Sequence, residues 1–381
     1  MQNPIVYTLV DRAEALPAAL ADLAASPSLA LDMEMENSYH HYGLHIALIQ
    51  ISTAQQKHYI FDPLAAIDIQ PLGALLTGRR KELILHDADF DLRACHQIYR
   101  WKLKRLFDTK LAAQLCGYRR FGLGHLLRDL LRIQVDKKFQ TFDWMQRPLP
   151  PAALDYAARD TASLHALQTI LTERLVALGR WTWAQEEFQR LERYPPRETP
   201  VAAHLRINRS SLLTPRQLAV LHALTIFRDQ MARNINRPVH YVIQDALLVQ
   251  LAVQPPANAK ALRAMRGMHP LIYRAANTRQ LLEALAQGQA APEEIHPQRR
   301  QRPPSQAGYA QRLKALQEWR RARAKPLDLE PFLIWPNDAL QWCARHPQEP
   351  LPADVASQIR AWQQEMFGDD FQRQCTKPPQ P

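Results

Sequence analysis

The sequence predicts an α/β domain with a mixed sheet, followed by two small all-helical domains. Three observations lead to this prediction. Over roughly the first 180 residues, apolar segments of strand length alternate with amphipathic helical segments, the pattern of an α/β layer. Residues 212–288 and 309–367 show helical apolar periodicity throughout. Two stretches rich in proline and arginine, at 193–200 and 296–306, have the composition of linkers and separate these parts.

The elements of the first domain follow from local patterns. A strand at 4–10 precedes a helix that ends near residue 25 and opens with acids in capping-box spacing. Segments 29–35, 45–52 and 57–61 are joined by short turns, which predicts an antiparallel meander. The remaining elements are strands at 82–86 and 105–109 and helices near 90–99, 110–115, 122–131 and 151–178.

The positive charge is concentrated in the second half of the chain. Residues 1–200 carry 24 lysines and arginines against 23 acidic residues, whereas residues 201–381 carry 24 against 14. A near-neutral half joined to a basic half suits an enzyme that acts on a polyanion, with the basic half adding affinity. The alternative interpretation is that the excess arginine serves only solubility.

Cysteine usage and hydropathy predict a soluble, cytoplasmic protein. The four cysteines are scattered and form no CxxC pair, so we expect neither a disulfide framework nor a zinc site. The first residues lack the basic and apolar regions of a signal peptide. No apolar run approaches the ~20 residues that a membrane helix needs, so no membrane association is expected.

Three short segments place acidic side chains where they could hold divalent cations. Asp32 and Glu34 are two residues apart in an apolar strand, so both carboxylates lie on one face. Asp91 follows another apolar strand and opens a helix, and Tyr156 and Asp160 share a helix face at i, i+4. Without matching bases, these acids would repel one another unless cations neutralised them. Hard oxygen ligands favour Mg²⁺ or Mn²⁺.

Each segment also has a plainer interpretation. An acid pair on a strand is usually a solvated face, although the apolar residues before Asp32 predict burial here. Asp91 could simply cap its helix, and Asp87 or Asp89 could take its place. The acid and tyrosine on the later helix could be an exposed pair. Taken together, their order and contexts favour a two-metal site that cleaves phosphodiesters.

At these residues the chain resembles a known family. Asp32-x-Glu34, Asp91 after a phenylalanine, and Tyr156-x-x-x-Asp160 resemble the three motifs of the DEDD exonuclease superfamily. The tyrosine indicates the tyrosine subgroup, because the position where the other subgroup has histidine, five residues before the last aspartate, holds another aspartate. The connecting segments FDTKLAAQL, FGLGHLL and VDKKFQTFDWMQRPLPPAALDYAARD resemble the ribonuclease D family.

The resemblance implies a division of the whole chain. Residues 1–192 would form a ribonuclease H-like exonuclease domain with a mixed sheet, and residues 211–290 resemble the helical HRDC module. Residues 309–370 are similar to a degenerate second HRDC copy. The expected connecting segments are linkers at 193–210 and 291–308 and a disordered tail at 371–381.

The family likeness implies a 3′→5′ exoribonuclease that releases nucleoside 5′-monophosphates, with tRNA 3′-end maturation as its setting. It implies that Asp32, Glu34, Asp91 and Asp160 bind two metal ions, Asp32 bridging both, while Tyr156 orients the attacking water. RNA, as tRNA precursors, is the expected partner, and no obligate protein partner is inferred.

Further polar residues are candidate contacts to nucleic acid. Lys137, Lys138 and Arg147 could bind phosphate, although a solvated lysine pair is an equally good interpretation. For the histidines at 40, 41 and 45, a surface loop that touches RNA is favoured over a metal site, because their spacing is not the helical i, i+4 pattern.

Two other functions remain open at this point. A DNA exonuclease of proofreading type would use the same carboxylates, and the 2′-hydroxyl contact that discriminates the sugars cannot be located from sequence. A catalytically silent scaffold would bind nucleic acid through its basic helical half. The presence of all four acids and the tyrosine argues against the scaffold.

Overall fold

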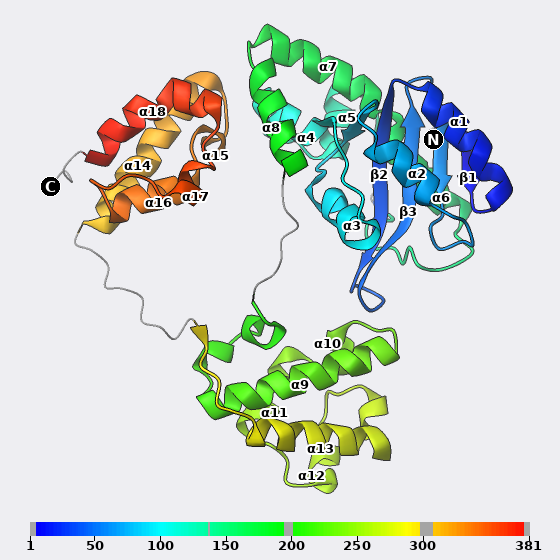
Figure 1. The fold of residues 1–381 in the computed structure, drawn as a ribbon, viewed down its shortest axis with the longest axis vertical. Coiled ribbons are helices and arrows are strands. Elements are labelled where there is room, and N and C mark those ends of the chain that lie inside the picture. Colours follow the sequence, from blue (N-terminus) through cyan, green and yellow to red (C-terminus); the bar gives the residue numbers. More distant parts are fainter. Residues whose placement is uncertain (1–4, 136–137, 194–200, 298–307, 377–381) are drawn as a thin grey trace.

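The structure, a computed structural model, describes residues 5–135, 138–193, 201–297 and 308–376. Residues 5–193 form an α/β domain, residues 201–297 a first helical domain, and residues 308–376 a second helical domain (Figure 1). The fold class predicted from the sequence is therefore confirmed. Within the described ranges, every helix is too short or too polar to cross a lipid bilayer.

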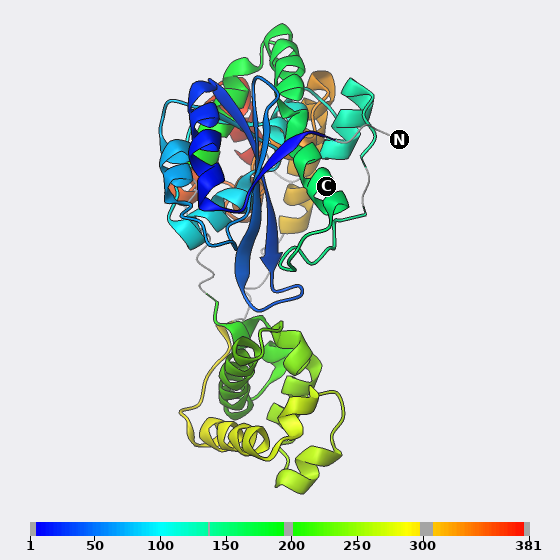
Figure 2. The same cartoon turned by 90° about the vertical axis from the view of Figure 1, so that its right-hand side faces the viewer.

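One mixed sheet of six strands forms the centre of the α/β domain, in the order β1-β4-β3-β2-β5-β6. The strands are β1 (Tyr7–Val10), β2 (Ser28–Asn37), β3 (Leu44–Thr53), β4 (His58–Phe61), β5 (Glu82–Leu85) and β6 (Leu106–Asp108). The antiparallel pairs β2/β3 and β3/β4 confirm the predicted meander. The other strands pair in parallel: β1 with β4, β5 with β2, and β6 with β5. The hairpin of β2 and β3 extends beyond the sheet towards the first helical domain (Figure 2).

The helices of this domain cover both faces of the sheet. They are α1 (Leu16–Ala25), α2 (Gln70–Thr77), α3 (Asp89–Tyr99), α4 (Thr109–Leu115), α5 (Leu123–Leu131), α6 (Pro151–Ala162), α7 (Leu164–Ala177) and α8 (Trp181–Arg193). The single helix expected over 151–178 is two helices, because the backbone of Ser163 (φ −106°, ψ 0°) breaks the helical course between α6 and α7. Helix α1 also starts without the expected capping box, since no side chain caps its first turn.

Alternation along β2 assigns its side chains to two different cores. Leu29, Leu31 and Met33 pack into the core under α1, α2 and α3. Ala30 belongs to the opposite core, with residues of α4 and α7. Because side chains alternate along a strand, Asp32 and Glu34 lie on the same face as Ala30. This is the face that α6 covers.

The first helical domain contains α9 (Pro215–Asn234), α10 (Val239–Val242), α11 (Asp245–Val253), α12 (Ala259–Ala264) and α13 (Ala275–Ala290). Thr214 and Gln217 exchange side-chain and backbone hydrogen bonds in a capping box, which fixes the start of α9. The packed unit extends beyond the expected range 211–290 at both ends. His204 and His296 are 1% and 3% exposed, and Glu294 accepts from the His204 ring at 2.6 Å.

The second helical domain contains α14 (Tyr309–Ala324), α15 (Pro331–Ile334), α16 (Asn337–Arg345), α17 (Ala353–Ala356) and α18 (Ala361–Thr376). Cys343 of α16 and Cys375 of α18 form a disulfide, although the scattered cysteines led us to expect no disulfide framework. The expected tail from residue 371 is also wrong for 371–376, because Phe371 packs in the core and keeps that segment helical. Residues 377–381 lie outside the described residues.

The second helical domain packs against the α/β domain. Trp362 stacks on Trp183 of α8 with centroids 4.3 Å apart and planes 11° apart. The guanidinium of Arg360 donates to both oxygens of Glu187, at 2.6 and 3.0 Å. Because α8 shares one apolar core with α14, α16 and α18, these two parts form a continuous packed body.

Candidate active site

Three of the predicted carboxylates meet on the α6 face of the sheet. One oxygen of Asp32, one of Glu34 and one of Asp160 all lie within 4.8 Å of one another. β2 supplies the first two from alternate positions, and α6, which crosses this face, supplies the third. The spacing of the acids in the sequence therefore translates into a compact group of oxygen ligands, of the kind that divalent cations bind.

The hairpin geometry fixes where the strand carboxylates lie. Asp32 is the register partner of Gln50, and Glu34 is that of Leu48. The β2/β3 register shifts directly after Glu34, a bulge of the kind that re-aims side chains beside active sites. Glu34 thus ends the first stretch of regular pairing, and the pairing resumes in a shifted register from Met35 to Asn37.

Asp91 is the fourth carboxylate, and it comes from α3, outside the group of three. It lies in the first turn of α3 and is 7% exposed. Burial raises the pKa of Glu34 most, and the charges of Asp32, Asp160 and Asp91 raise it further. Burial also raises the pKa of Asp91 most, and the charge of Asp32 adds to this effect. The two acids that could have taken the place of Asp91 form ion pairs instead: Asp87 pairs with Lys110 at 2.5 Å and Asp89 with Arg93 at 2.6 Å.

Burial and mutual repulsion hold the protons on these carboxyls in the absence of cations. Burial raises the pKa of Asp32 to about 7. Burial, together with the charge of Asp32, raises the pKa values of Glu34, Asp91 and Asp160 well above the ordinary carboxyl range. No basic side chain among the described residues pairs with these acids, and such a group of carboxylates carries a free-energy cost that bound cations remove. The donor set therefore fits divalent metal ions.

Tyr156 lies on α6 one turn before Asp160, as the spacing predicted. Its ring packs against Phe139 and Trp144, with centroid distances of 5.5 and 6.2 Å. Sequence reasoning did not single out these two aromatic side chains. The signal was present in the run FQTFDWM, but nothing in its spacing indicates that a loop folds it around the tyrosine.

A cavity of about 1130 Å³ opens beside Tyr156 and Asp160. Arg132, Lys138 and Arg159 also line it, and Arg159 is paired with Asp155 of the same lining at 2.8 Å, so Arg132 and Lys138 add positive charge next to the acids. This combination suits an anionic polymer whose scissile phosphate reaches the carboxylates.

The predicted phosphate contacts have different surroundings. Lys138 lies at the cavity, with its ammonium 5.8 Å from the centre of the Phe139 ring. Lys137 lies outside the described residues. Arg147 donates to both oxygens of Asp62, at 2.6 and 2.7 Å, and to the carbonyl of Ala47. The guanidinium of Arg147 thus has a structural task, tying the loop of Trp144 to the sheet.

Gln50 is a second residue that sequence reasoning missed. It is fully buried opposite Asp32, and among the described residues neither polar atom of its amide has a hydrogen-bond partner. A buried amide normally finds partners, because leaving it unpaired is costly. An orphaned amide at the strand position facing a predicted metal ligand is a further sign that the site holds more than protein atoms.

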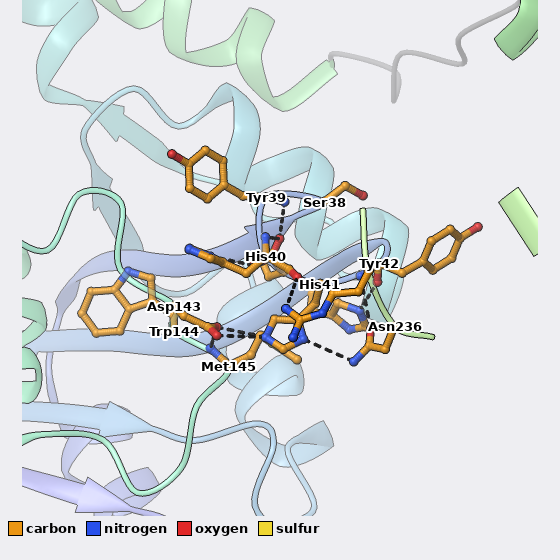
Figure 3. Close-up of polar contacts among 12 residues, drawn as sticks. Ser38, Tyr39, His40, His41, Tyr42, Asp143, Trp144, Met145 and Asn236 are labelled. Atoms are coloured by element: carbon orange, nitrogen blue, oxygen red, sulfur yellow. Dashed lines mark hydrogen bonds and ion pairs between the residues drawn. The ribbon is translucent and has the colours of Figure 1, made fainter. Parts of the chain in front are cut away.

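The histidine-rich tip of the β2/β3 hairpin lies next to the loop that contains Asp143 and Trp144 (Figure 3). Glu36 accepts from the backbone N–H of Tyr39 and of His40, which closes the tip. The Nε2 of His41 bonds to both oxygens of Asp143, at 3.1 and 3.0 Å. The helical spacing that signals zinc is absent here, yet an oxygen of Glu36, a nitrogen of His40 and an oxygen of Asp143 do lie within 4.8 Å of one another.

Comparison with known families agrees with this geometry. A family model described as a 3′–5′ exonuclease matches residues 7–176, and the HRDC domain model matches residues 217–285. Ribonuclease D of Pseudomonas paraeruginosa is 30% identical over 345 residues, which cover 90% of each chain. The chain belongs to the ribonuclease D family. Ribonuclease D of Gluconacetobacter diazotrophicus is 28% identical over 370 residues, 95% of this chain and 91% of that one.

Solved structures share the fold over the full length. The crystal structure of Escherichia coli RNase D superposes with a TM-score of 0.72 at 23% identity, covering 98% of this chain and 100% of that chain. A protein from Bifidobacterium adolescentis gives a TM-score of 0.84 at 22% identity, covering 99% of both chains. As a member of the ribonuclease D family, the protein is a 3′→5′ exoribonuclease that depends on divalent metal ions.

Proposed function

We propose that Asp32, Glu34, Asp91 and Asp160 hold a pair of Mg²⁺ or Mn²⁺ ions, and that the enzyme removes nucleoside 5′-monophosphates from the 3′ ends of RNA. The observation that carries the proposal is the meeting of three carboxylate oxygens within 4.8 Å, with raised pKa values and with no ion pair to a basic side chain of the described ranges. When bound, paired divalent ions activate water and stabilise the leaving oxygen of a phosphodiester.

The chain's own residues orient the reactants. Asp32, central to the electrostatic coupling of the cluster, is the candidate for the carboxylate shared between both ions. Tyr156 is too weak an acid to serve as the base at neutral pH, because a phenol has a pKa near ~10. Its hydroxyl instead accepts and donates hydrogen bonds that orient the attacking water, while Phe139 and Trp144 fix the direction of its ring.

The proposed substrates are structured RNAs with single-stranded 3′ ends, tRNA precursors among them. Membership in the ribonuclease D family supports this choice, and Escherichia coli RNase D is described as an exoribonuclease involved in structured RNA processing. Arg132 and Lys138, which line the cavity, would guide the 3′ end to the carboxylates. The basic residues of 201–381 would bind the body of the RNA.

A direct assay tests this proposal. The protein is incubated with 5′-labelled RNA and with DNA of the same sequence, in Mg²⁺, in Mn²⁺ and in EDTA. We expect a ladder that shortens from the 3′ end of the RNA, released nucleoside 5′-monophosphates, and no cleavage in EDTA. Degraded DNA beside intact RNA would support the proofreading-type alternative instead. A precursor tRNA with a 3′ trailer, compared with the same RNA whose 3′ end is paired, tests the substrate class.

A further inference from the structure

The tip of the β2/β3 hairpin is held by the first helical domain. The hydroxyl of Tyr42 donates to Asp229 at 2.8 Å, and the Arg233 guanidinium lies 5.4 Å from the centre of the Tyr42 ring. The Tyr42 ring also packs against the apolar core of the first helical domain. Arg237 donates to the carbonyl of His40 at 3.3 Å. We call these contacts, together with the bonds of His41 and Asn236, the latch.

The direction of the hydrogen bonds at Asn236 is fixed by its neighbours (Figure 3). The backbone N–H of Tyr42 donates to Oδ1 of Asn236 at 3.2 Å. The Nδ2 of Asn236 therefore donates to Nδ1 of His41, also at 3.2 Å. With Nδ1 acting as the acceptor, the proton of a neutral imidazole lies on Nε2, which donates to Asp143. One tautomer of His41 thus satisfies partners in both domains at once.

The chain of contacts continues to the proposed catalytic tyrosine. Asp143 also accepts from the backbone N–H of Met145 at 3.1 Å, which shapes the turn that contains Trp144. Trp144 is 4% exposed and packs against Tyr156 with a centroid distance of 6.2 Å. A shift of the Asp143 carboxylate therefore moves the loop that holds the Tyr156 ring.

We infer that His41 is a positioning residue for the reaction: it couples docking of the first helical domain to the orientation of Tyr156. The inference rests on the proposed role of Tyr156. Loss of the Asn236 bond removes one of the two partners that hold the His41 ring, which weakens the hold of His41 on the Asp143 carboxylate. The resulting displacement of the Trp144 loop changes the position of the Tyr156 hydroxyl, whose orientation matters in the transition state. The first helical domain then contributes to catalysis as well as to RNA binding.

An RNA dinucleotide separates these two contributions, because such a short substrate can occupy the active site without extending to the first helical domain. On this substrate we expect Asn236→Ala to lower kcat roughly 3- to 10-fold with little change in KM, a modest effect beside the ~10²-fold loss that misplacement can cause. The matched control is Asn234→Ala, which alters the exposed asparagine that ends α9, two residues before Asn236 and outside the latch, and should leave kcat unchanged.

Two further variants test the route through His41. His41→Gln can still donate to Asp143 from its terminal amide, so it should retain more activity than His41→Ala. In a Tyr156→Phe background, Asn236→Ala should have no further effect on single-turnover cleavage, since the hydroxyl that it orients is gone. Thermal unfolding and divalent-metal binding of each variant confirm that the fold and the carboxylate site are intact.

The results that would overturn the inference are distinct from those that would overturn the proposed function. Unchanged kcat on the dinucleotide, with weaker binding of long RNA, would limit the first helical domain to substrate binding. If Asn236→Ala lowered single-turnover cleavage as much in the Tyr156→Phe background as in the wild type, its effect would not depend on Tyr156. If Tyr156→Phe alone kept full activity, the role proposed for that residue would fail, and the coupling inference would fall with it.

Discussion

The ring of Trp144 lies 6.2 Å from the ring of Tyr156, with 31° between their planes. Phe139 packs against the same tyrosine at 5.5 Å. Because these contacts involve the ring and not the hydroxyl, replacing the tyrosine by phenylalanine preserves the packing. The hydroxyl can therefore be tested separately from the aromatic side chains that hold it.

Tyr156→Phe should leave metal binding and RNA binding near normal while lowering catalysis by roughly 10²- to 10⁴-fold, the range for a lost acid–base or orienting group. The loss should fall on kcat more than on KM, because the oriented water matters chiefly in the transition state. Steady-state kinetics on short RNA, with metal binding measured by calorimetry, checks both. Full kcat in this variant would reduce Tyr156 to a packing residue.

The metal-free protein should become less stable as the pH rises from about 4 to about 7. The pKa of Asp32 in the fold is about 7 against an ordinary value of 3.8, so the folded state binds the proton more tightly than the unfolded chain. This contribution to stability is present at low pH and is lost as the pH rises through the folded-state pKa. Urea unfolding in EDTA across this range measures it.

Asp32→Asn should flatten that pH dependence. An amide does not ionise, so the metal-free variant should match or exceed the stability of the metal-free wild type at pH 7 and above. The free energies of unfolding of the two metal-free proteins should converge towards pH 4. A variant that is much less stable than the wild type at pH 8 in EDTA would show that the carboxylate stabilises the fold, contrary to the electrostatics described above.

Basic residues of the first helical domain should govern the salt dependence of RNA binding. Arg263 and Arg266 are exposed on or beside α12. If both bind phosphate, the double change to glutamine should reduce the slope of log affinity against log salt by roughly 0.7 to 0.9 for each phosphate that the protein no longer neutralises. Cleavage of a dinucleotide should be unchanged. Binding titrations of a structured RNA at several salt concentrations decide the matter, and an unaltered slope would exclude both residues from the RNA interface.

Docking of the second helical domain should contribute to the stability of the whole body. Trp362 is 4% exposed and stacks on Trp183 at 4.3 Å. Trp362→Ala should lower the free energy of unfolding by about 3–5 kcal/mol, the usual cost of removing a buried large aromatic side chain. The control is Trp342→Ala, at a half-buried tryptophan of α16, which should cost clearly less. Equal costs in urea unfolding would show that the stacked pair adds nothing beyond local burial.

The parts that the sequence predicted well depend on local periodicity. Alternation of apolar residues along β2 places Asp32 and Glu34 on one face, and the helical period places Tyr156 and Asp160 on one face of α6. Each of these relationships spans only a few residues. Residues at short, regular spacings lie on one face of a strand or helix, so much of the carboxylate cluster could be predicted from the sequence.

The parts that it missed depend on contacts between distant segments. The 32-residue separation of Cys343 and Cys375 carries no signal of pairing, yet α16 and α18 bring their Cα atoms to 5.5 Å. Gln50 becomes notable only through its register with Asp32. His41 meets Asn236 from a position 195 residues away. Periodicity within one helix or strand gives no information about any of these long-range contacts.

In the proposed function, the carboxylate cluster binds the divalent ions and carries the exoribonuclease activity. Asp32→Asn tests it most directly, with Asp89→Asn as the matched control, since Asp89 is a nearby acid in the first turn of α3 that pairs with Arg93 instead. Calorimetric Mn²⁺ binding and cleavage of 5′-labelled RNA are measured on both variants. We predict that Asp32→Asn remains folded, loses high-affinity Mn²⁺ binding and shows no more than a trace of cleavage, while Asp89→Asn behaves as wild type. Cleavage well above a trace by Asp32→Asn would contradict the account.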